Sequence, residues 1–300
     1  MSKLSIRRIT VTGRGRGPQG VNILVVITVR EWFCDSTGGI RLTDAAEGLV
    51  RGKMFESSTL LVRQHEGEVV EAIRYYDRIA DLSDRDLQTE GGLHGYLRRL
   101  EKILAGIQGS AVLEVGAGAG RFSIALKERG FSVLATDLSH GMLRRLSQRC
   151  SDIPTVVADA HHLPFRDGIF DSVFSSDVLE HLPNPSQAIK EQTRVCRSKG
   201  TIQAIVPNGL CPYYWRNLLR ERYWWRYGTS PIHSRRSLKE MASIFKSHGL
   251  RLYQLDTFLL VPTRVRGRGF ATFRAIEKFA ERILPVRLFL GVNYILAGPS

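Results

Sequence analysis

The stretch VLEVGAGAGRFSIALKERG, Val112–Gly130, decides the fold of this chain. A short apolar run meets three glycines at alternate positions, Gly116, Gly118 and Gly120, and a helical pattern follows. Residues without side chains let backbone N–H groups and the start of the next helix approach a ligand closely. The stretch therefore predicts a buried strand, a ligand-binding turn and a helix, with a tight turn that binds nothing as the alternative.

After the glycines, short apolar strands alternate with helices along the chain. This alternation predicts an α/β protein whose parallel sheet is covered by helices on both faces, with ligands bound at the carboxyl ends of the strands. The expected strands are Val112–Val115, Ser132–Ser139, Thr155–Ala160, Phe170–Ser176, Thr201–Pro207, Leu250–Thr257 and Asn293–Gly298.

Helical spacing of apolar residues predicts the elements between and before these strands. The segment Phe270–Leu284 is amphipathic, with Phe273, Ile276, Phe279 and Ile283 along one stripe. The expected helices are Glu68–Leu82, His94–Ile107, Arg121–Arg129, Met142–Cys150, Ser186–Cys196, Tyr213–Tyr227, Ser237–Ser247 and Phe270–Leu284.

The net charge of +14 is unevenly distributed. Residues 1–100 carry +2, residues 101–209 carry +1, and residues 210–300 carry +11, from 16 basic and 5 acidic residues. A basic third of this kind can attract nucleic acid, an anionic membrane surface or an acidic substrate, or it is simply a solvated surface. Four scattered cysteines indicate reduced thiols rather than a disulfide framework or a zinc site, and we expect no bound metal.

The two ends of the chain differ from its middle. We interpret residues 1–67 as an N-terminal extension, in which RGRGPQG, Arg14–Gly20, is flexible and only Val21–Phe33 has strand character; Met54 as the true start is the alternative. Residues 68–300 form the main domain, with a basic, aromatic-rich helical insert at 210–290. No apolar run reaches the length of a membrane span, and no signal-peptide cleavage site follows the first apolar strand.

The acidic residues near the glycines discriminate between nucleotide ligands. A dinucleotide fold favours G-x-G-x-x-G, whereas here Arg121 occupies the place of the last glycine. Asp137, at the end of the second strand, can accept from ribose hydroxyls in either case, but Asp159 can accept from an adenine amino group. Together with Glu114 these carboxylates suit a cationic sulfonium ligand better than a pyrophosphate. The residues point to S-adenosyl-L-methionine.

The motifs in succession resemble those of class I S-adenosylmethionine-dependent methyltransferases, from about Tyr75 to Pro207. The subgroup with ubiquinone and menaquinone biosynthesis enzymes and many small-molecule methyltransferases is the most similar. The resemblance implies a Rossmann-like, seven-stranded, mostly parallel sheet with an antiparallel last strand. It rests on LEVGAGAGRFS (Leu113–Ser123), ATDLS (Ala135–Ser139), ADAHHLPFRDGIFDSVFSSDVLEHLPNP (Ala158–Pro185) and VPN (Val206–Asn208).

The resemblance also implies a role for each residue of the cofactor site. The glycine loop and the acid before it would flank the methionine part, and the acid ending the second strand would bind both ribose hydroxyls beside an apolar residue that packs on adenine. Two residues after the third strand would hold the adenine edge, and a serine would lie near the methyl group. In that order, these residues are Glu114, Gly116, Gly118, Gly120, Asp137, Leu138, Asp159, Ala160 and Ser176.

No catalytic residue is assigned with the same support. His181 is a candidate general base, with orientation of a helix or of the pocket as the alternative, and His161 and His162 are expected to be solvated loop residues. The segment after the fourth strand reads SSDVLEHL, Ser175–Leu182, and lacks the Pro-Pro-aromatic pattern of enzymes that methylate base amino groups.

We therefore expect a cytoplasmic enzyme, with peripheral membrane contact through its basic C-terminal third, that transfers a methyl group to O or C of a small-molecule or lipid-like acceptor. Nucleic acid is disfavoured as a partner. Methylation of RNA or protein, and a non-catalytic cofactor-binding domain, are the alternatives.

Overall fold

The computed structural model describes residues 73–77, 80, 85–211, 236–258, 266–282 and 291–299, together with the backbone of five short strands between residues 5 and 42. The expected helix Tyr213–Tyr227 and residue Ile283 lie outside the described residues. Of the expected helix Glu68–Leu82, residues 73–77 are helical. None of the helices described is both long enough and apolar enough to cross a membrane.

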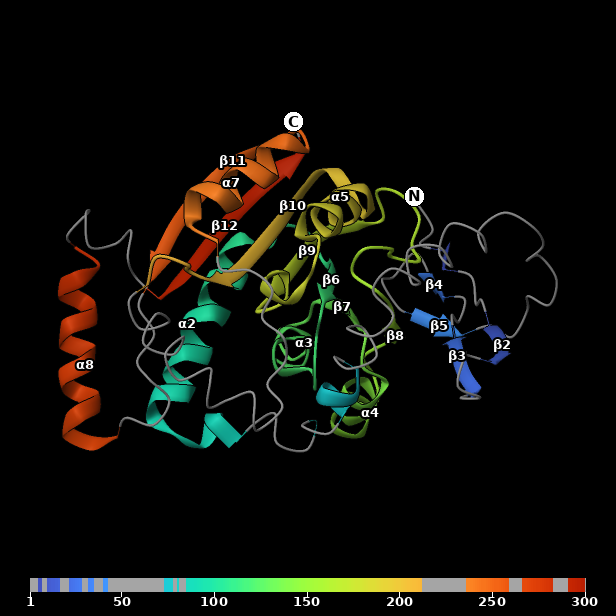
Figure 1. The fold of residues 1–300 in the computed structure, drawn as a ribbon, viewed down its shortest axis with the longest axis horizontal. Helices are drawn as coiled ribbons and strands as arrows, with labels where there is room; N and C mark the ends of the chain where they lie inside the picture. Colours follow the sequence, from blue (N-terminus) through green and yellow to red (C-terminus); the bar gives the residue numbers. More distant parts are fainter. Residues whose placement is uncertain are drawn as a thin grey trace.

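The centre of the molecule is a seven-stranded sheet in the order β11-β12-β10-β9-β6-β7-β8 (Figure 1). Strand β12 pairs antiparallel with both β10 and β11, while β10, β9, β6, β7 and β8 pair parallel. The predicted α/β, Rossmann-like sheet with an antiparallel last strand is confirmed. The strands are β6 Ala111–Val115, β7 Ser132–Asp137, β8 Thr155–Val157, β9 Phe170–Ser176, β10 Cys196–Pro207, β11 Leu250–Phe258 and β12 Val292–Pro299.

Helices cover both faces of the sheet, as the alternating pattern predicts. Apolar residues of α2 and α3 pack in one core cluster, and those of α5 and α7 pack in another cluster on the opposite face. Helix α4 packs beside α3 against β7 and β8. The helices are α2 Glu90–Gly106, α3 Arg121–Lys127, α4 His140–Arg149, α5 Pro185–Val195, α7 Leu238–Ser247 and α8 Gly267–Ala280.

The starts of three helices follow from capping side chains in the sequence. Thr89 accepts from the backbone N–H of Gly92 at the start of α2, and Ser139 accepts from that of Met142 in α4. Ser237 begins α7 with a reciprocal capping box. Each cap satisfies a backbone donor that the first helical turn leaves unpaired, which is why these elements begin where they do.

The N-terminal strands correct one expectation. The structure has β1 Ser5–Ile6, β2 Thr10–Arg16, β3 Asn22–Thr28, β4 Trp32–Cys34 and β5 Ile40–Leu42. The expected flexible segment therefore begins inside a strand, because residues 14–16 of β2 pair antiparallel with residues 22–24 of β3. Pairing with an apolar partner strand outweighs the low strand propensity of the glycines, a long-range effect that local composition does not carry.

Side chains along β6, the strand that leads into the glycine loop, alternate between the two faces of the sheet. Leu113 and Val115 pack toward α5 and α7, whereas Val112 packs toward α2 and α3. Glu114 is on the same side as Val112, is only 2% exposed, and accepts a hydrogen bond from the hydroxyl of Ser123 in α3. Burial raises the pKa of Glu114 to about 8, although the hydrogen bond from Ser123 opposes the shift. A buried carboxyl thus links β6 to α3 beneath the loop.

Gly118 and Gly120 offer a matched pair for testing the loop's packing. Both have positive φ, 55° and 82°, but a Cβ on Gly120 would come within 2.1 Å of Leu146, whereas a Cβ on Gly118 meets no atom within 4 Å. We expect Gly118→Ala to lower the free energy of unfolding by about 1–2 kcal/mol through backbone strain. Gly120→Ala should add about 1–3 kcal/mol from overpacking. Urea unfolding measures both, and equal losses would contradict this packing.

The raised pKa of Glu114 predicts a pH dependence of stability. Between its ordinary pKa of 4.5 and about 8, the folded state holds a proton that the unfolded state has released. Stability from this group is therefore present at low pH and declines as pH rises, by about 1.4 kcal/mol per pH unit. Glu114→Gln cannot titrate and should lack this decline. Unfolding free energies of both proteins, compared across this pH range, test the prediction; parallel curves would refute it.

Candidate functional site

The glycine loop connects β6 to α3 at the carboxyl edge of the sheet. The backbone N–H groups of Gly116 and Ala117 both donate to the carbonyl of Thr136, at 2.8 Å, which anchors the start of the loop to β7. The side chain of Val178, which follows β9, packs against Gly116. At Gly118 the loop is open, since no atom would contact an added Cβ. The loop is thus held on one side and leaves its backbone accessible on the other.

Asp137 ends β7 and fixes the far side of the loop. Its two carboxylate oxygens accept from the backbone N–H groups of Gly118 and Ser139, each at 2.8 Å. Burial raises the pKa of Asp137, and these hydrogen bonds oppose that shift. Because each carboxylate oxygen has two lone pairs, both oxygens keep the capacity to accept a further hydrogen bond. Two ligand hydroxyls could therefore be held here without breaking the internal contacts.

A second carboxylate, Asp77, reaches the same place from residues 73–77. It accepts from the Ser139 hydroxyl at 2.5 Å and from the Gly141 backbone N–H at 2.9 Å. The N-terminal end of α4 is thus capped twice, by Ser139 from within and by Asp77 from a segment distant in the sequence. A carboxylate at a helix N-terminus is favourable because the helix dipole is positive there.

Asp159 and Ala160 follow β8. The Asp159 carboxylate accepts from the backbone N–H of His161 at 2.9 Å and contacts the Nδ1 atom of its ring at 2.7 Å. Partial burial would raise the pKa of Asp159, but the hydrogen bonds and charge of His161, with a smaller contribution from His162, hold it below its ordinary value. The Ala160 methyl group packs in the core. Ala160 therefore has only its backbone to offer a ligand.

The expectation that both histidines of this loop are solvated is wrong for His161. Its side chain is mostly buried, and its Nε2 atom has no hydrogen-bond partner. His162 is half-exposed, as expected. Local polarity in the sequence does not reveal that Asp159 draws the first of the two rings inward.

A polar cluster follows β9. Ser176 is partly exposed, and Asp177 adopts a left-handed φ of 56° while its carboxylate pairs with Arg99 of α2 at 3.1 Å. Glu180 is buried, with one carboxylate oxygen lacking a hydrogen-bond partner. Burial raises its pKa well above the ordinary value, and the nearby charge of Asp177 raises it further.

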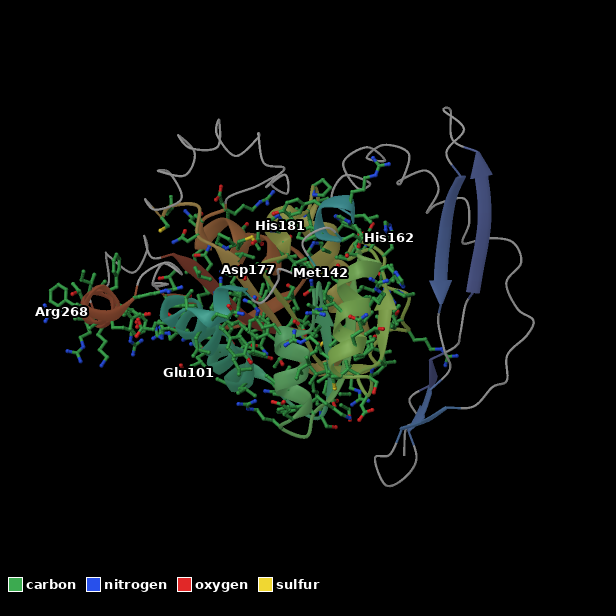
Figure 2. All side chains as sticks on the ribbon, turned by 90° about the horizontal axis from the view of Figure 1, so that it is seen from below. Glu101, Met142, His162, Asp177, His181 and Arg268 are labelled. Atoms are coloured by element: carbon green, nitrogen blue, oxygen red, sulfur yellow. The ribbon has the colours of Figure 1, made fainter. Side chains whose placement is uncertain are left out.

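His181 lies next to this cluster. Its Nε2 atom is 3.8 Å from a carboxylate oxygen of Glu180, and its ring packs edge-on against Tyr76, with ring centres 6.1 Å apart. Tyr76 also packs with Met142 of α4, so residues 73–77 connect the end of β9 to the start of α4 (Figure 2). His181 is thus held by neighbours on one edge while its side chain remains partly exposed.

The topology brings the predicted site residues together. Their segments follow β6, β7, β8 and β9, which are neighbours in the order β9-β6-β7-β8, so the carboxyl ends of these parallel strands meet at one edge. Glu114 differs from the others because its side chain points beneath the loop to Ser123. In the part of the chain that the structure describes, no group of three His, Cys, Asp or Glu residues could hold a metal ion.

Sequence reasoning missed several residues of this edge. Asp77 and Tyr76 come from a segment whose pattern indicated only a helix, and Arg99 comes from α2. Their side chains reach the site through tertiary packing, which no local spacing encodes. Glu180 could have been noticed as the acid beside the candidate His181, but only its burial sets it apart.

Comparison with known proteins agrees with this geometry. Residues 113–204 match the family described as "Methyltransferase domain". A malonyl-[acyl-carrier protein] O-methyltransferase of Geobacter sulfurreducens is 35% identical over 113 residues, which are 34% of this chain and 42% of that protein. A demethylmenaquinone methyltransferase of Renibacterium salmoninarum is 32% identical over 134 residues, 44% of this chain and 56% of that protein. The chain thus spans about half the length of these relatives.

A solved structure extends the likeness to the fold. The crystal structure of an S-adenosylmethionine-dependent methyltransferase from Thermotoga maritima, described as a possible histamine N-methyltransferase, superposes with a TM-score of 0.58 at 16% identity. It covers 76% of this chain and all of that one. Since the family match begins in β6 and ends in β10, the part of the chain that is similar to a methyltransferase domain is the part that forms the candidate site.

Proposed function

We propose that this chain transfers a methyl group from S-adenosyl-L-methionine to O or C of a small-molecule or lipid-like acceptor. The observation that carries the proposal is the meeting of the open glycine loop with Asp137 and Asp159 at one edge of the sheet. A loop that is open at Gly118, flanked by carboxylates with free acceptor capacity, fits a ligand that carries a cationic centre and several hydroxyl and amino donors.

We assign the cofactor contacts from that geometry together with the resemblance to class I methyltransferases. Asp137 binds the two ribose hydroxyls, and the partly exposed Leu138 packs on the adenine. The exposed part of the Asp159 carboxylate and the Ala160 backbone hold the adenine edge. The loop Gly116–Gly120 receives the methionine part, with Glu114 supporting it from below and Ser176 beside the methyl group.

The protein contributes mainly alignment to such a reaction. S-adenosyl-L-methionine supplies a methyl group already activated by its sulfonium. The chain holds the acceptor atom in line with that group and excludes water, which can account for about 7–11 kcal/mol of the barrier. Where the acceptor is a hydroxyl that must lose its proton, the partly exposed His181 ring is placed to accept it, oriented by Tyr76 and Glu180.

Two observations support the proposed class of methyl acceptor: the names of the similar proteins and the charge of the C-terminal third. Their names describe methylation of a malonyl group on acyl carrier protein and of demethylmenaquinone, so both a carrier-linked acyl group and a quinone are models for this acceptor. The charge of +11 on residues 210–300 supports peripheral contact with an anionic membrane, at which a lipid-like acceptor would be reached from the cytoplasm. RNA or protein methylation, and cofactor binding without catalysis, are the competing functions.

Replacing one oxygen of the Asp137 carboxylate tests the cofactor site. In Asp137→Asn the amide nitrogen cannot accept from Gly118, Ser139 or a ribose hydroxyl, and a hydrogen bond to a charged group is worth about 1.5–3 kcal/mol. We expect the affinity for S-adenosyl-L-homocysteine, measured by calorimetry, to fall at least about tenfold. Asp152→Asn, at an exposed acid after α4, is the matched control and should bind normally. Equal affinities for the two variants would exclude the assigned role.

A labelling experiment tests the acceptor class. The purified protein is incubated with methyl-labelled S-adenosyl-L-methionine and host extract, which is then separated into lipid, small-molecule, RNA and protein fractions. We expect label in the lipid or small-molecule fraction with wild type and none with Asp137→Asn. Label in RNA or free protein would replace the proposed acceptor with a polymer. Normal cofactor binding without label in any fraction would favour a non-catalytic domain.

A further inference from the structure

Helix α8 lies at the outer edge of the molecule beside α2 (Figure 1). Its contact with α2 is made by charged side chains. Glu277 is fully buried, and its carboxylate oxygens lie 3.0 and 2.9 Å from the Nε2 atom of His94; Arg274 donates to the same carboxylate at 2.7 Å. The inward face of α8 is therefore a polar cluster.

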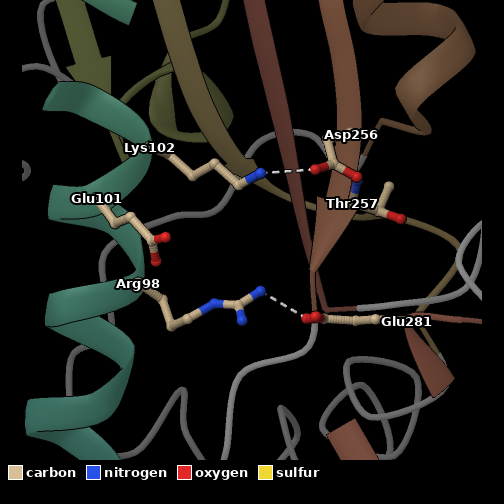
Figure 3. Close-up of a pocket in the computed structure, with 6 residues that line it drawn as sticks. All are labelled: Arg98, Glu101, Lys102, Asp256, Thr257 and Glu281. Atoms are coloured by element: carbon tan, nitrogen blue, oxygen red, sulfur yellow. Dashed lines mark hydrogen bonds and ion pairs between the residues drawn. The ribbon is translucent and has the colours of Figure 1, made fainter. Parts of the chain in front are cut away.

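The end of α8 is held in the same way. Glu281, which follows the last residue of the helix, accepts from Arg98 of α2 at 2.6 Å (Figure 3). Close by, Lys102 of α2 donates to Asp256 of β11 at 2.7 Å. These two ion pairs border a cavity of about 290 Å³ that is also lined by Glu101 and Thr257. Because both of its cations are already paired with carboxylates, the cavity serves attachment of α8 better than capture of an anion.

The outward face of α8 carries two large apolar residues. Ile276 is 49% exposed and Phe279 is 67% exposed, whereas the apolar stripe of an amphipathic helix usually packs inward. Arg268 and Lys278 are exposed on this side as well, and Figure 2 shows Arg268 pointing away from the rest of the molecule. We call Arg268, Ile276, Lys278 and Phe279 the outer face of α8.

The acidic side chains of α8 lie on a different face of the helix from its exposed basic side chains. Both acids of the segment 266–282, Glu277 and Glu281, are turned to α2 and paired there. The outer face is left with arginine and lysine beside a phenylalanine and an isoleucine. Single exposed apolar residues are ordinary on protein surfaces, but their combination with cations and the removal of every acid is the pattern of helices that lie in an anionic lipid interface.

We propose that the outer face of α8 docks onto an anionic membrane surface. The apolar side chains enter the boundary between headgroups and acyl chains, and the cations contact lipid phosphates. Charge complementarity favours this occupant over a second copy of the chain, because two such cationic faces would repel each other. This proposal rests on the proposed function in one respect, because it assigns the membrane contact of residues 210–300 to helix α8. It does not depend on methyl transfer.

Vesicle co-sedimentation without cofactor or acceptor tests the docking. The full chain is mixed with vesicles of phosphatidylcholine alone or with added phosphatidylglycerol. Binding is expected with the anionic vesicles, with a decline as salt is raised. The double variant Ile276→Ser/Phe279→Ser should bind at least about tenfold more weakly, since each substitution removes an apolar side chain that would enter the lipid. Arg268→Glu/Lys278→Glu should weaken binding at least about fivefold per cation.

Matched controls come from exposed residues elsewhere. Tyr253 on β11 is 52% exposed, so Tyr253→Ser removes a comparable apolar surface, and Arg144→Glu/Lys190→Glu reverses two exposed cations on α4 and α5. Both should bind anionic vesicles within about twofold of wild type. Equal binding by the α8 variants and these controls would overturn the proposal, and so would a failure of wild type to bind anionic vesicles.

Two further measurements distinguish lipid docking from self-association and from damage to the cofactor site. Analytical ultracentrifugation without lipid would detect association through Ile276 and Phe279, and a dimer abolished by Ile276→Ser/Phe279→Ser would assign the face to a second copy and overturn the lipid proposal. Calorimetry with S-adenosyl-L-homocysteine should give wild-type affinity for the α8 variants. A variant that no longer binds vesicles but still binds S-adenosyl-L-homocysteine with wild-type affinity has lost the docking alone. The membrane proposal can therefore fail without affecting the proposed cofactor site.

Discussion

The carboxylate of Asp137 joins the parts of the molecule on which the site depends. One oxygen accepts from the backbone of Gly118 in the glycine loop and the other from the backbone of Ser139 at the start of α4. The Ser139 hydroxyl in turn donates to Asp77 and accepts from the Met142 N–H. Hydrogen bonds to charged groups are among the stronger ones in proteins. This chain of bonds fixes three segments that are distant in the sequence around one edge of the sheet.

The accumulation of acids at this edge constrains the ligand. The charge of Asp77 adds to the raised pKa of Asp137, and the charge of Asp177 adds to that of Glu180, while Asp177 itself pairs with Arg99. A ligand that brought more negative charge, such as a pyrophosphate, would add to this repulsion, whereas a sulfonium would relieve it. A glycine loop alone is compatible with a dinucleotide or with S-adenosyl-L-methionine, and the charges at this edge favour the second ligand. The acids named in the sequence motifs and the acids that the fold adds favour the same ligand.

The sequence predicts the elements of the sheet well because their determinants are local. Apolar runs, the glycines and capping residues such as Ser139 lie within each element, so β6 to β12 and their helices are found near the expected positions. Side chains that act across the fold are not predictable in this way. Asp77 caps a helix from a distant segment, His161 is drawn inward by Asp159, and β2 forms because β3 pairs with it.

Helix α8 shows how a correct local pattern can leave orientation undetermined. The spacing of Phe273, Ile276 and Phe279 predicts an amphipathic helix, but only the tertiary contacts reveal that its acidic side chains are paired with α2. The same helix α2 faces the site, because Arg99 pairs with Asp177 while the preceding Arg98 pairs with Glu281 beyond α8. Adjacent residues of one helix therefore hold both the inward side of α8 and the segment that follows β9.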